Sequence, residues 1–414
     1  MVEVESTKDL CLRLFKENIG PGITVALVSI PLSIALAIAS GATPFMGLAS
    51  AIYAPIISGI IGGSNYNILG PAGALVNIIG GLVAENGVQI VPLVAIVSGI
   101  FLMIIYLLKL EHYCTLLPTS VLEGFSMGVA ITIGCGQLNA ALGLAKLVKH
   151  KEFVDNIVET FSNLGSTDFV EFTPFLVFFI ILMCLSKFVP GKPWIILIAI
   201  LGIIYGYVMS KFVPQFKPTL LIDKYAEMGK SVNIIDFSYM KNSIPVSNII
   251  VGAAKVAFVA ALETLISARI GDHLTGTRFD SSKEVRGLSI SNIVCGLLGG
   301  TPCTGVLVRT AINISSGATS KVSQMINGFV VLIVILVALP CFTFIPMPVI
   351  ASILITSACR LIPMKMIVHM YHENKFDCFI LIFTGILCVV VDGAFGLMIG
   401  GVICLLLNAS KTNL

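Results

Sequence analysis

The sequence predicts an all-α membrane protein with fourteen transmembrane segments in two inverted repeats of seven. The first observation is composition, because 57% of the residues are hydrophobic and only 11% are charged. A soluble domain carries about 25% charged residues. The second is a series of apolar runs long enough to cross a bilayer. The third is a pair of shorter runs that share one pattern, one in each half of the chain.

Composition also excludes several classes of protein. The net charge of +3 is too small to predict binding to nucleic acid. The eleven cysteines stand singly, so we expect buried apolar side chains and no metal site. No nucleotide-binding loop, zinc-ligand spacing or hydrolase triad is visible, and we expect neither an enzyme nor an organic cofactor. The mixed-charge start lacks the features of a signal peptide, which favours a retained first span.

Twelve runs have the length of a span. They lie near residues 20–40, 44–61, 88–108, 119–144, 169–189, 193–212, 246–271, 284–299, 323–340, 347–361, 377–392 and 393–408. Two more, near 70–83 and 303–318, are too short to cross alone, and they are segments three and ten.

The distribution of basic residues predicts the orientation. With an even number of spans both termini share one side, and the loops of that side hold 14 Lys and Arg against 8 opposite. The positive-inside rule therefore makes both termini cytoplasmic. On this basis 1–19 is a cytoplasmic segment, 213–245 an extracytoplasmic loop and 409–414 a tail. We expect the protein in the plasma membrane or the inner membrane of its cell.

An internal repeat follows from sliding the chain by 232 residues, which places Gly73 on Gly305 and Asn77 on Arg309. Chance alone could match such common residue types. The matching pairs, however, hold the same ordinal place in each half, 20–212 and 246–408. Because seven is odd, the second half enters the membrane from the opposite side, so segments three and ten point toward each other near the midplane.

Two facing half-helices suit an anion. A helix that begins inside the membrane leaves its first N–H groups without partners and carries about half a positive charge at that end. Pro71 and Pro302 interrupt the chain before each half-helix. Arg309, about one turn into the second, adds a permanent charge.

Few other ionisable residues fall inside the spans. Glu263 is in mid-span, which suggests either coupling and gating or simple neutralisation of Arg309 or Lys255. Arg269 and Asp272 are spaced for an i,i+3 pair within one helix. Lys255 is placed to extend toward the membrane interface. The five histidines fall in or beside loops, which gives little support to a buried proton relay.

At this point the residues resemble a known family. Residues 261–330 contain a mid-span glutamate, a D-x-L-T-G-T-R-x-D-S loop and a G-G-x-P…R-T-x-x-N…G half-helix. Together with 20–41 and 67–75, this region is similar to the SulP (sulfate permease) family of anion transporters. The resemblance implies a UraA-like division into core and gate domains, and a homodimer. Members carry sulfate, bicarbonate, chloride, other halides or dicarboxylates, some with sodium or protons and others by exchange.

The resemblance also implies the site residues. The anion site of the family is lined by the starts of segments three and ten and by segment one, which here gives Leu32, Leu36, Ala72, Gly73, Ala74, Leu75, Gly305, Val306, Leu307, Val308 and Arg309. Glu263 and Ser267 match the positions that help bind sodium in some members. Leu307 replaces a hydroxyl residue there, which weakens the sodium interpretation and leaves a proton as the other coupling ion.

Two further departures affect what the resemblance implies. Leu32 stands where many relatives have glutamine, and it makes the predicted pocket more apolar. The chain also stops at Leu414, before the soluble STAS domain of most relatives. We therefore expect a membrane domain without it, either because the protein lacks that domain or because the chain is a truncated part of a longer one.

We therefore expect a secondary active transporter of bicarbonate, sulfate or chloride that works by alternating access, as a symporter or an exchanger. Its expected partners are the anion, the lipid bilayer and a second copy of the chain. An uncoupled anion channel is the main alternative. A nucleobase–cation symporter is less favoured, because Leu75 and Leu307 offer no polar group to a base.

Overall fold

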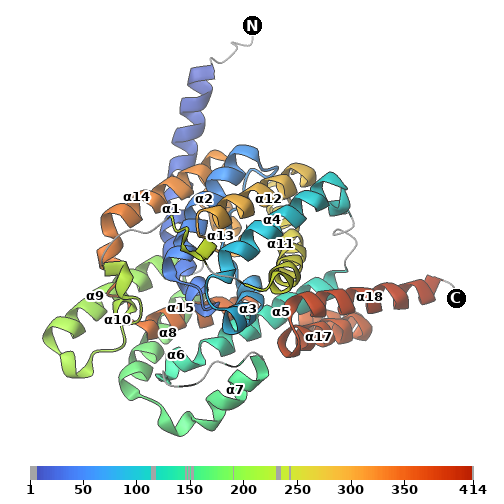
Figure 1. Cartoon of the computed structure of the whole chain (residues 1–414). Coiled ribbons are helices and arrows are strands. Elements are labelled where there is room, and N and C mark those ends of the chain that lie inside the picture. Colours follow the sequence, from blue (N-terminus) through green and yellow to red (C-terminus); the bar gives the residue numbers. More distant parts are fainter. Residues whose placement is uncertain are drawn as a thin grey trace.

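The computed structural model describes residues 7–112, 118–144, 147, 150, 153–189, 191–229, 235–241 and 244–412. Within these residues the chain is built of helices and one two-stranded antiparallel sheet (Figure 1). The all-α class predicted from composition is confirmed. Parts of the predicted 1–19, 213–245 and 409–414 segments lie outside the described residues.

Each of the fourteen predicted segments contains a helix. In the first half these are α1 (Thr7–Ala39), α2 (Pro44–Ile61), α3 (Val76–Asn86), α4 (Ile90–Leu107), α5 (Thr119–Gly136), α8 (Phe169–Phe188) and α9 (Trp194–Phe212). In the second half they are α11 (Val246–Thr275), α12 (Ser281–Leu297), α13 (Leu307–Ser315), α14 (Val322–Phe342), α15 (Met347–Leu361), α17 (Lys375–Val390) and α18 (Gly393–Thr412). The remaining short helices are α6 (Leu138–Leu142), α7 (Phe153–Ser162), α10 (Leu221–Lys224) and α16 (Met364–Glu373).

Segments three and ten are half-helices, as the sequence predicts. Each follows a two-residue strand, β1 (Leu69–Gly70) before α3 and β2 (Thr304–Gly305) before α13. The strands pair antiparallel, with Leu69 opposite Gly305 and Gly70 opposite Thr304. A 3-10 turn, Gly73–Leu75, connects β1 to α3. The two half-helices therefore meet at their N-terminal ends.

Helix length agrees with membrane insertion. Among the described residues, nine helices are long and apolar enough to cross a bilayer when α5 is joined to α6 and α15 to α16. The other predicted segments, α3, α12, α13, α17 and α18, fall short of that length or hydropathy. The first helix begins at Thr7 and projects from the bundle, so it reaches farther than the apolar run starting at residue 20 indicates (Figure 1).

The helices pack in two groups that interleave the two halves of the chain. In the group that we call the core, α1–α4 pack with α11–α14, and in the group that we call the gate, α5–α9 pack with α15–α18. Small residues let core helices approach closely, because a Cβ on Gly296 of α12 would lie 2.5 Å from the carbonyl oxygen of Pro92. The observed grouping is the core and gate division that the resemblance implies.

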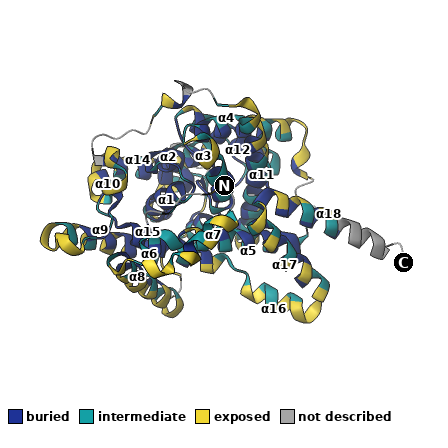
Figure 2. Ribbon diagram, turned by 60° about the horizontal axis from the view of Figure 1, so that its bottom comes forward, coloured by how far each residue is buried: buried dark blue, intermediate teal, exposed yellow. Residues whose placement is uncertain are grey.

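Burial separates the interior of the bundle from its outer faces. Buried residues concentrate in the middle of the molecule, whereas the outer faces of α8 and α9 are exposed (Figure 2). These exposed faces carry large apolar side chains, including Phe188, Ile204 and Phe212. Apolar faces of this kind are what helices present to lipid.

The segment after α9 folds back onto the start of α15. The Leu221 N–H donates to the Ile345 carbonyl at 2.9 Å, and the Met347 N–H donates to the Thr219 carbonyl at 2.8 Å. The Glu171 carboxylate at the start of α8 accepts from the Thr219 N–H at 2.6 Å. Residues 219–221 of the predicted 213–245 loop are thus anchored on the gate. Asp236 and Tyr239 of the same loop instead donate to the carbonyls of Leu298 and Leu297, at the end of α12 in the core.

Candidate functional site

The two half-helices begin without capping side chains. Neither Ala72, before the turn into α3, nor Val306, before α13, provides a side-chain cap hydrogen bond. The preceding backbone is held instead by the Val306 N–H on the Ile68 carbonyl at 3.0 Å and the Gly305 N–H on the Thr264 hydroxyl at 2.8 Å. Uncapped N-termini carry partial positive charge, so this junction attracts an anion.

Arg309 is the third residue of α13 and is fully buried. Its Nη2 donates to the Ser33 hydroxyl of α1 at 2.9 Å. Its Nε and Nη1 have no hydrogen-bond partner among the described residues. A guanidinium carries five N–H donors, and leaving donors unpaired in a buried place is costly unless a ligand takes them up.

A glycine makes room for this side chain. The guanidinium lies against Gly70 of β1, where any Cβ would overlap Nη1. Gly70 and Ser33 come from the first half of the chain, whereas Arg309 comes from the second. The guanidinium from the second half of the chain is therefore positioned by residues of the first half.

Glu263 does not pair with Arg309. Its Oε2 accepts a hydrogen bond from the Thr304 hydroxyl of β2 at 3.1 Å, while the described contacts of the guanidinium are those with Ser33 and Gly70. No hydrogen bond or ion pair joins Glu263 to Arg309 or Lys255 among the described residues, although an electrostatic attraction links Glu263 to Arg309. Neutralisation of Arg309 by this carboxylate therefore stays a prediction. The carboxylate remains beside the start of the second half-helix.

Ser267 turns to other partners. Its hydroxyl contacts the Asn67 amide oxygen at 2.8 Å and the Thr310 hydroxyl at 3.1 Å. Glu263 and Ser267 thus lie on one helix but have different hydrogen-bond partners. A sodium site made of both residues stays a prediction.

Asn67 is the centre of a buried polar network. Its amide nitrogen donates to the Glu284 carboxylate of α12 at 2.7 Å, and its amide oxygen accepts from Thr310 at 3.0 Å. The same carboxylate accepts from the N–H groups of Gly63 and Ser64, each at 2.8 Å. The network ties α11, α12 and α13 to the chain that enters β1.

A small cavity lies between α1 and the entries to the half-helices, with room for about one water molecule. It is lined by Leu36, Ala37, Ser40, Pro71, Ala72, Val76, Ile79, Thr301 and Pro302. Of the residues predicted to bind substrate, Leu36 and Ala72 line it. A second small cavity contacts Gly73 and Ala74, together with residues of α5 and α17.

The other predicted site residues lie outside these cavities. Leu75 is fully buried and packs in an apolar cluster with residues of α4 and α11. Leu32 is buried in the large apolar cluster around α1, and Val306 is buried beside β1. Leu307 and Val308 are partly exposed. The predicted substrate-binding residues therefore lie around the meeting point of the two half-helices, but they do not line a single cavity.

Two interpretations of charged residues need correction. Asp272 does not pair with Arg269, because its carboxylate accepts from the Thr277 hydroxyl at 2.7 Å and the Phe279 N–H at 2.6 Å and so caps the loop after α11. Lys255, which was expected simply to extend toward the interface, has an acidic partner. Its ammonium lies 2.5 Å from the Asp392 carboxylate, just before α18.

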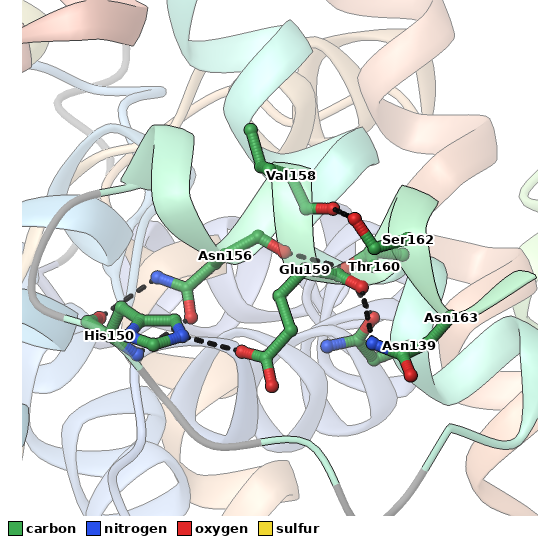
Figure 3. Close-up of polar contacts among 8 residues, drawn as sticks. All are labelled: Asn139, His150, Asn156, Val158, Glu159, Thr160, Ser162 and Asn163. Atoms are coloured by element: carbon green, nitrogen blue, oxygen red, sulfur yellow. Dashed lines mark hydrogen bonds and ion pairs between the residues drawn. The ribbon is translucent and has the colours of Figure 1, made fainter.

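The histidines lie away from this junction, and all five are exposed. His150 contacts the Glu159 carboxylate of α7 at 2.6 Å, in a surface cluster with Asn156 (Figure 3). His369 pairs with Glu373 on α16 at 3.1 Å. These contacts give no histidine path to Arg309.

Sequence reasoning missed three residues that shape the site: Ser33, Gly70 and Asn67. A hydroxyl inside an apolar helix gives no signal of its own, since it can bond to its own backbone. Asn67 was the more detectable of the three, because an amide between two apolar stretches needs a buried partner.

Two half-helices that meet at their N-terminal ends, in a core drawn from both halves of the chain, resemble the interrupted segments that form binding sites in many transporters. Residues 15–384 match the family model described as the sulfate permease family, and the chain belongs to this family.

Curated relatives support this assignment. The putative sulfate transporter YvdB of Bacillus subtilis (strain 168) is 33% identical over 390 residues, which cover 94% of this chain and 72% of that protein. The bicarbonate transporter BicA of Picosynechococcus sp. is 27% identical over 374 residues, which cover 84% of this chain and 62% of the relative. This chain thus spans only part of each relative.

Solved structures agree on the fold. The transmembrane domain of a cyanobacterial bicarbonate transporter BicA superposes with a TM-score of 0.79 at 25% identity, covering 94% of this chain and 98% of that domain. The structure of SLC26A9 gives a TM-score of 0.80 at 15% identity, covering 97% and 66%. The second likeness shows the fold alone.

Proposed function

We propose that this protein is a secondary active transporter of a small inorganic anion, bicarbonate, sulfate or chloride, that works by alternating access. The observation that carries the proposal is the buried Arg309, whose Nε and Nη1 find no partner among the described residues, beside two uncapped half-helix N-termini. Relatives described as sulfate and bicarbonate transporters support the same substrate class.

Glu263 is our candidate for the coupling site. It lies one residue before Thr264, which holds the Gly305 N–H, and it accepts from Thr304. A sodium ion or a proton at this carboxylate would therefore act on the backbone that starts the second half-helix. If the sodium ion or proton is carried together with the anion, the protein is a symporter. An exchanger of two anions needs no such ion.

We further infer a homodimer in the plasma membrane or inner membrane, with both termini cytoplasmic. The support is the surplus of basic residues in the terminus-side loops and the membership of the family.

The test uses the purified chain in proteoliposomes. Labelled bicarbonate, sulfate and chloride are offered in turn, each with and without an imposed sodium or proton gradient. The proposal expects saturable uptake of at least one anion. Large unitary currents without saturation would instead identify an anion channel, and an absence of anion flux under every gradient would contradict both.

A further inference from the structure

Among the described residues, one ion pair joins the core to the gate. Lys255 lies on α11 of the core, and Asp392 lies in the turn between α17 and α18 of the gate (Figure 1). Their Nζ and Oδ2 atoms are 2.5 Å apart, and the side chains are 34% and 14% exposed. The pair is therefore partly shielded from solvent at the boundary between the two groups.

The gate holds this lysine at two points. The second carboxylate oxygen of Asp392 accepts from the Phe395 N–H at 2.8 Å, which fixes the carboxylate at the start of α18. The Phe395 ring lies 5.8 Å from the Lys255 ammonium, within range of a cation–π contact. The described charged and aromatic contacts of this ammonium thus come from the gate.

Alternating access moves one of these groups against the other. When α18 separates from α11, Lys255 loses both the carboxylate and the aromatic ring. A partly buried ammonium is costly without an anionic partner. The anion that enters the opened path has the right charge to replace Asp392.

We propose that Lys255 is a second anion-binding point, occupied by the Asp392 carboxylate in the present conformation. The proposal rests on the proposed transport function and deepens it. In this proposal the Asp392 carboxylate occupies the place that the substrate anion takes on Lys255. Binding of an inorganic anion to Lys255 and separation of α18 from α11 therefore favour each other.

The position along α11 agrees with this role. Lys255 lies eight residues, about 12 Å, before Glu263 on the same helix. Around it the boundary is closed, because Val256 and Val259 are buried in one cluster with Ala394 and Leu397. At the opposite end of α11, Arg269 is exposed. Lys255 thus lies at a packed contact between the core and the gate, on the helix that also carries Glu263.

The test compares three variants by anion uptake from each face of oriented vesicles. Lys255→Met removes the cation and is expected to raise KM at least tenfold at the face nearest Lys255, with KM at the other face unchanged. Asp392→Asn removes the competing carboxylate and keeps a good helix cap, so KM at the same face should fall severalfold. Lys211→Met, an exposed lysine of α9, controls for net charge.

The exchange variant Lys255→Asp with Asp392→Lys separates binding from mere closure. It restores an ion pair and should regain the melting temperature lost in Lys255→Met, but it moves the cation to the gate, so KM should stay raised. If the exchange variant regains both the melting temperature and the KM of the unaltered protein, the pair only stabilises the closed arrangement, and the proposal is overturned. An unchanged KM in Lys255→Met would also overturn it. If the unaltered protein moves no anion, the proposed transport function is contradicted, and the role of Lys255 is contradicted with it.

Discussion

The guanidinium of Arg309 is placed by a serine and a glycine from the other half of the chain. Ser33 takes one of its donors, and Gly70 leaves the space that its Nη1 occupies. A charged side chain with so few contacts is costly in a buried place unless a ligand supplies the rest. We therefore expect affinity for the anion to respond to both neighbours.

Ser33→Ala removes the hydroxyl that holds Nη2. A hydrogen bond to a charged group contributes about 1.5–3 kcal/mol, so we expect KM for anion uptake to rise about tenfold or more. Ser29→Ala is the matched control, because Ser29 lies one turn earlier on α1, is equally buried and has no described hydroxyl partner. Equal effects of the two changes would contradict the role of Ser33.

Gly70→Ala places a methyl group on the guanidinium. The side chain must move, so we expect anion uptake to fall strongly while the protein remains folded in detergent. Gly81→Ala on α3 is the control, because a Cβ there meets nothing within 4 Å. Normal uptake by Gly70→Ala would show that anion transport does not need the observed position of the Arg309 guanidinium.

The paired half-helices are the elements on which the site depends. Their existence was predictable, because Pro71, Pro302 and the shared glycines interrupt two apolar runs at the same place in each half. The pairing of β1 with β2 was not, since two-residue strands have no periodicity to detect. Leu75, one of the predicted site residues, packs in a buried apolar cluster with residues of α4 and α11.

Asn67→Ala tests what holds these elements together. It leaves the buried Glu284, Ser267 and Thr310 groups short of a partner, so we expect a loss of about 2–4 kcal/mol in stability. Thermal unfolding in detergent measures the change. Asn86→Ala, at the far end of α3, removes one contact with Asn248 and should cost much less. A similar loss in both variants would argue against the network.

The whole molecule is two helix groups, each drawn from both halves of the chain. The fourteen helical segments followed from composition and length, and nine helices of the described chain are long and apolar enough to span a bilayer. The contacts between distant segments did not follow. Lys255 and Asp392 are 137 residues apart, and Ser33 and Arg309 are 276 apart. The pattern of a single sequence reports local periodicity only. Contacts between residues so far apart in the sequence can therefore be recognised only once the packing of the helices is known.

Glu263→Gln tests coupling at this level. The neutral amide keeps the size of the side chain and can still accept from Thr304, but it lacks the negative charge that attracts sodium and cannot take up or release a proton. We expect anion uptake down its own gradient to persist and accumulation driven by sodium or protons to be lost. Glu227→Gln, in an exposed turn, is the control. Full gradient-driven accumulation by Glu263→Gln would exclude this carboxylate as the coupling site.

Saturable anion uptake by Arg309→Ala, measured in proteoliposomes beside the unaltered protein and Arg269→Ala, tests the account most directly. Arg309 is buried at the junction of the half-helices, whereas Arg269 is an exposed arginine on α11. We predict that Arg309→Ala abolishes uptake or weakens it at least a hundredfold, with Arg269→Ala retaining it. Unchanged uptake by a folded Arg309→Ala protein would contradict an anion site built on this charge.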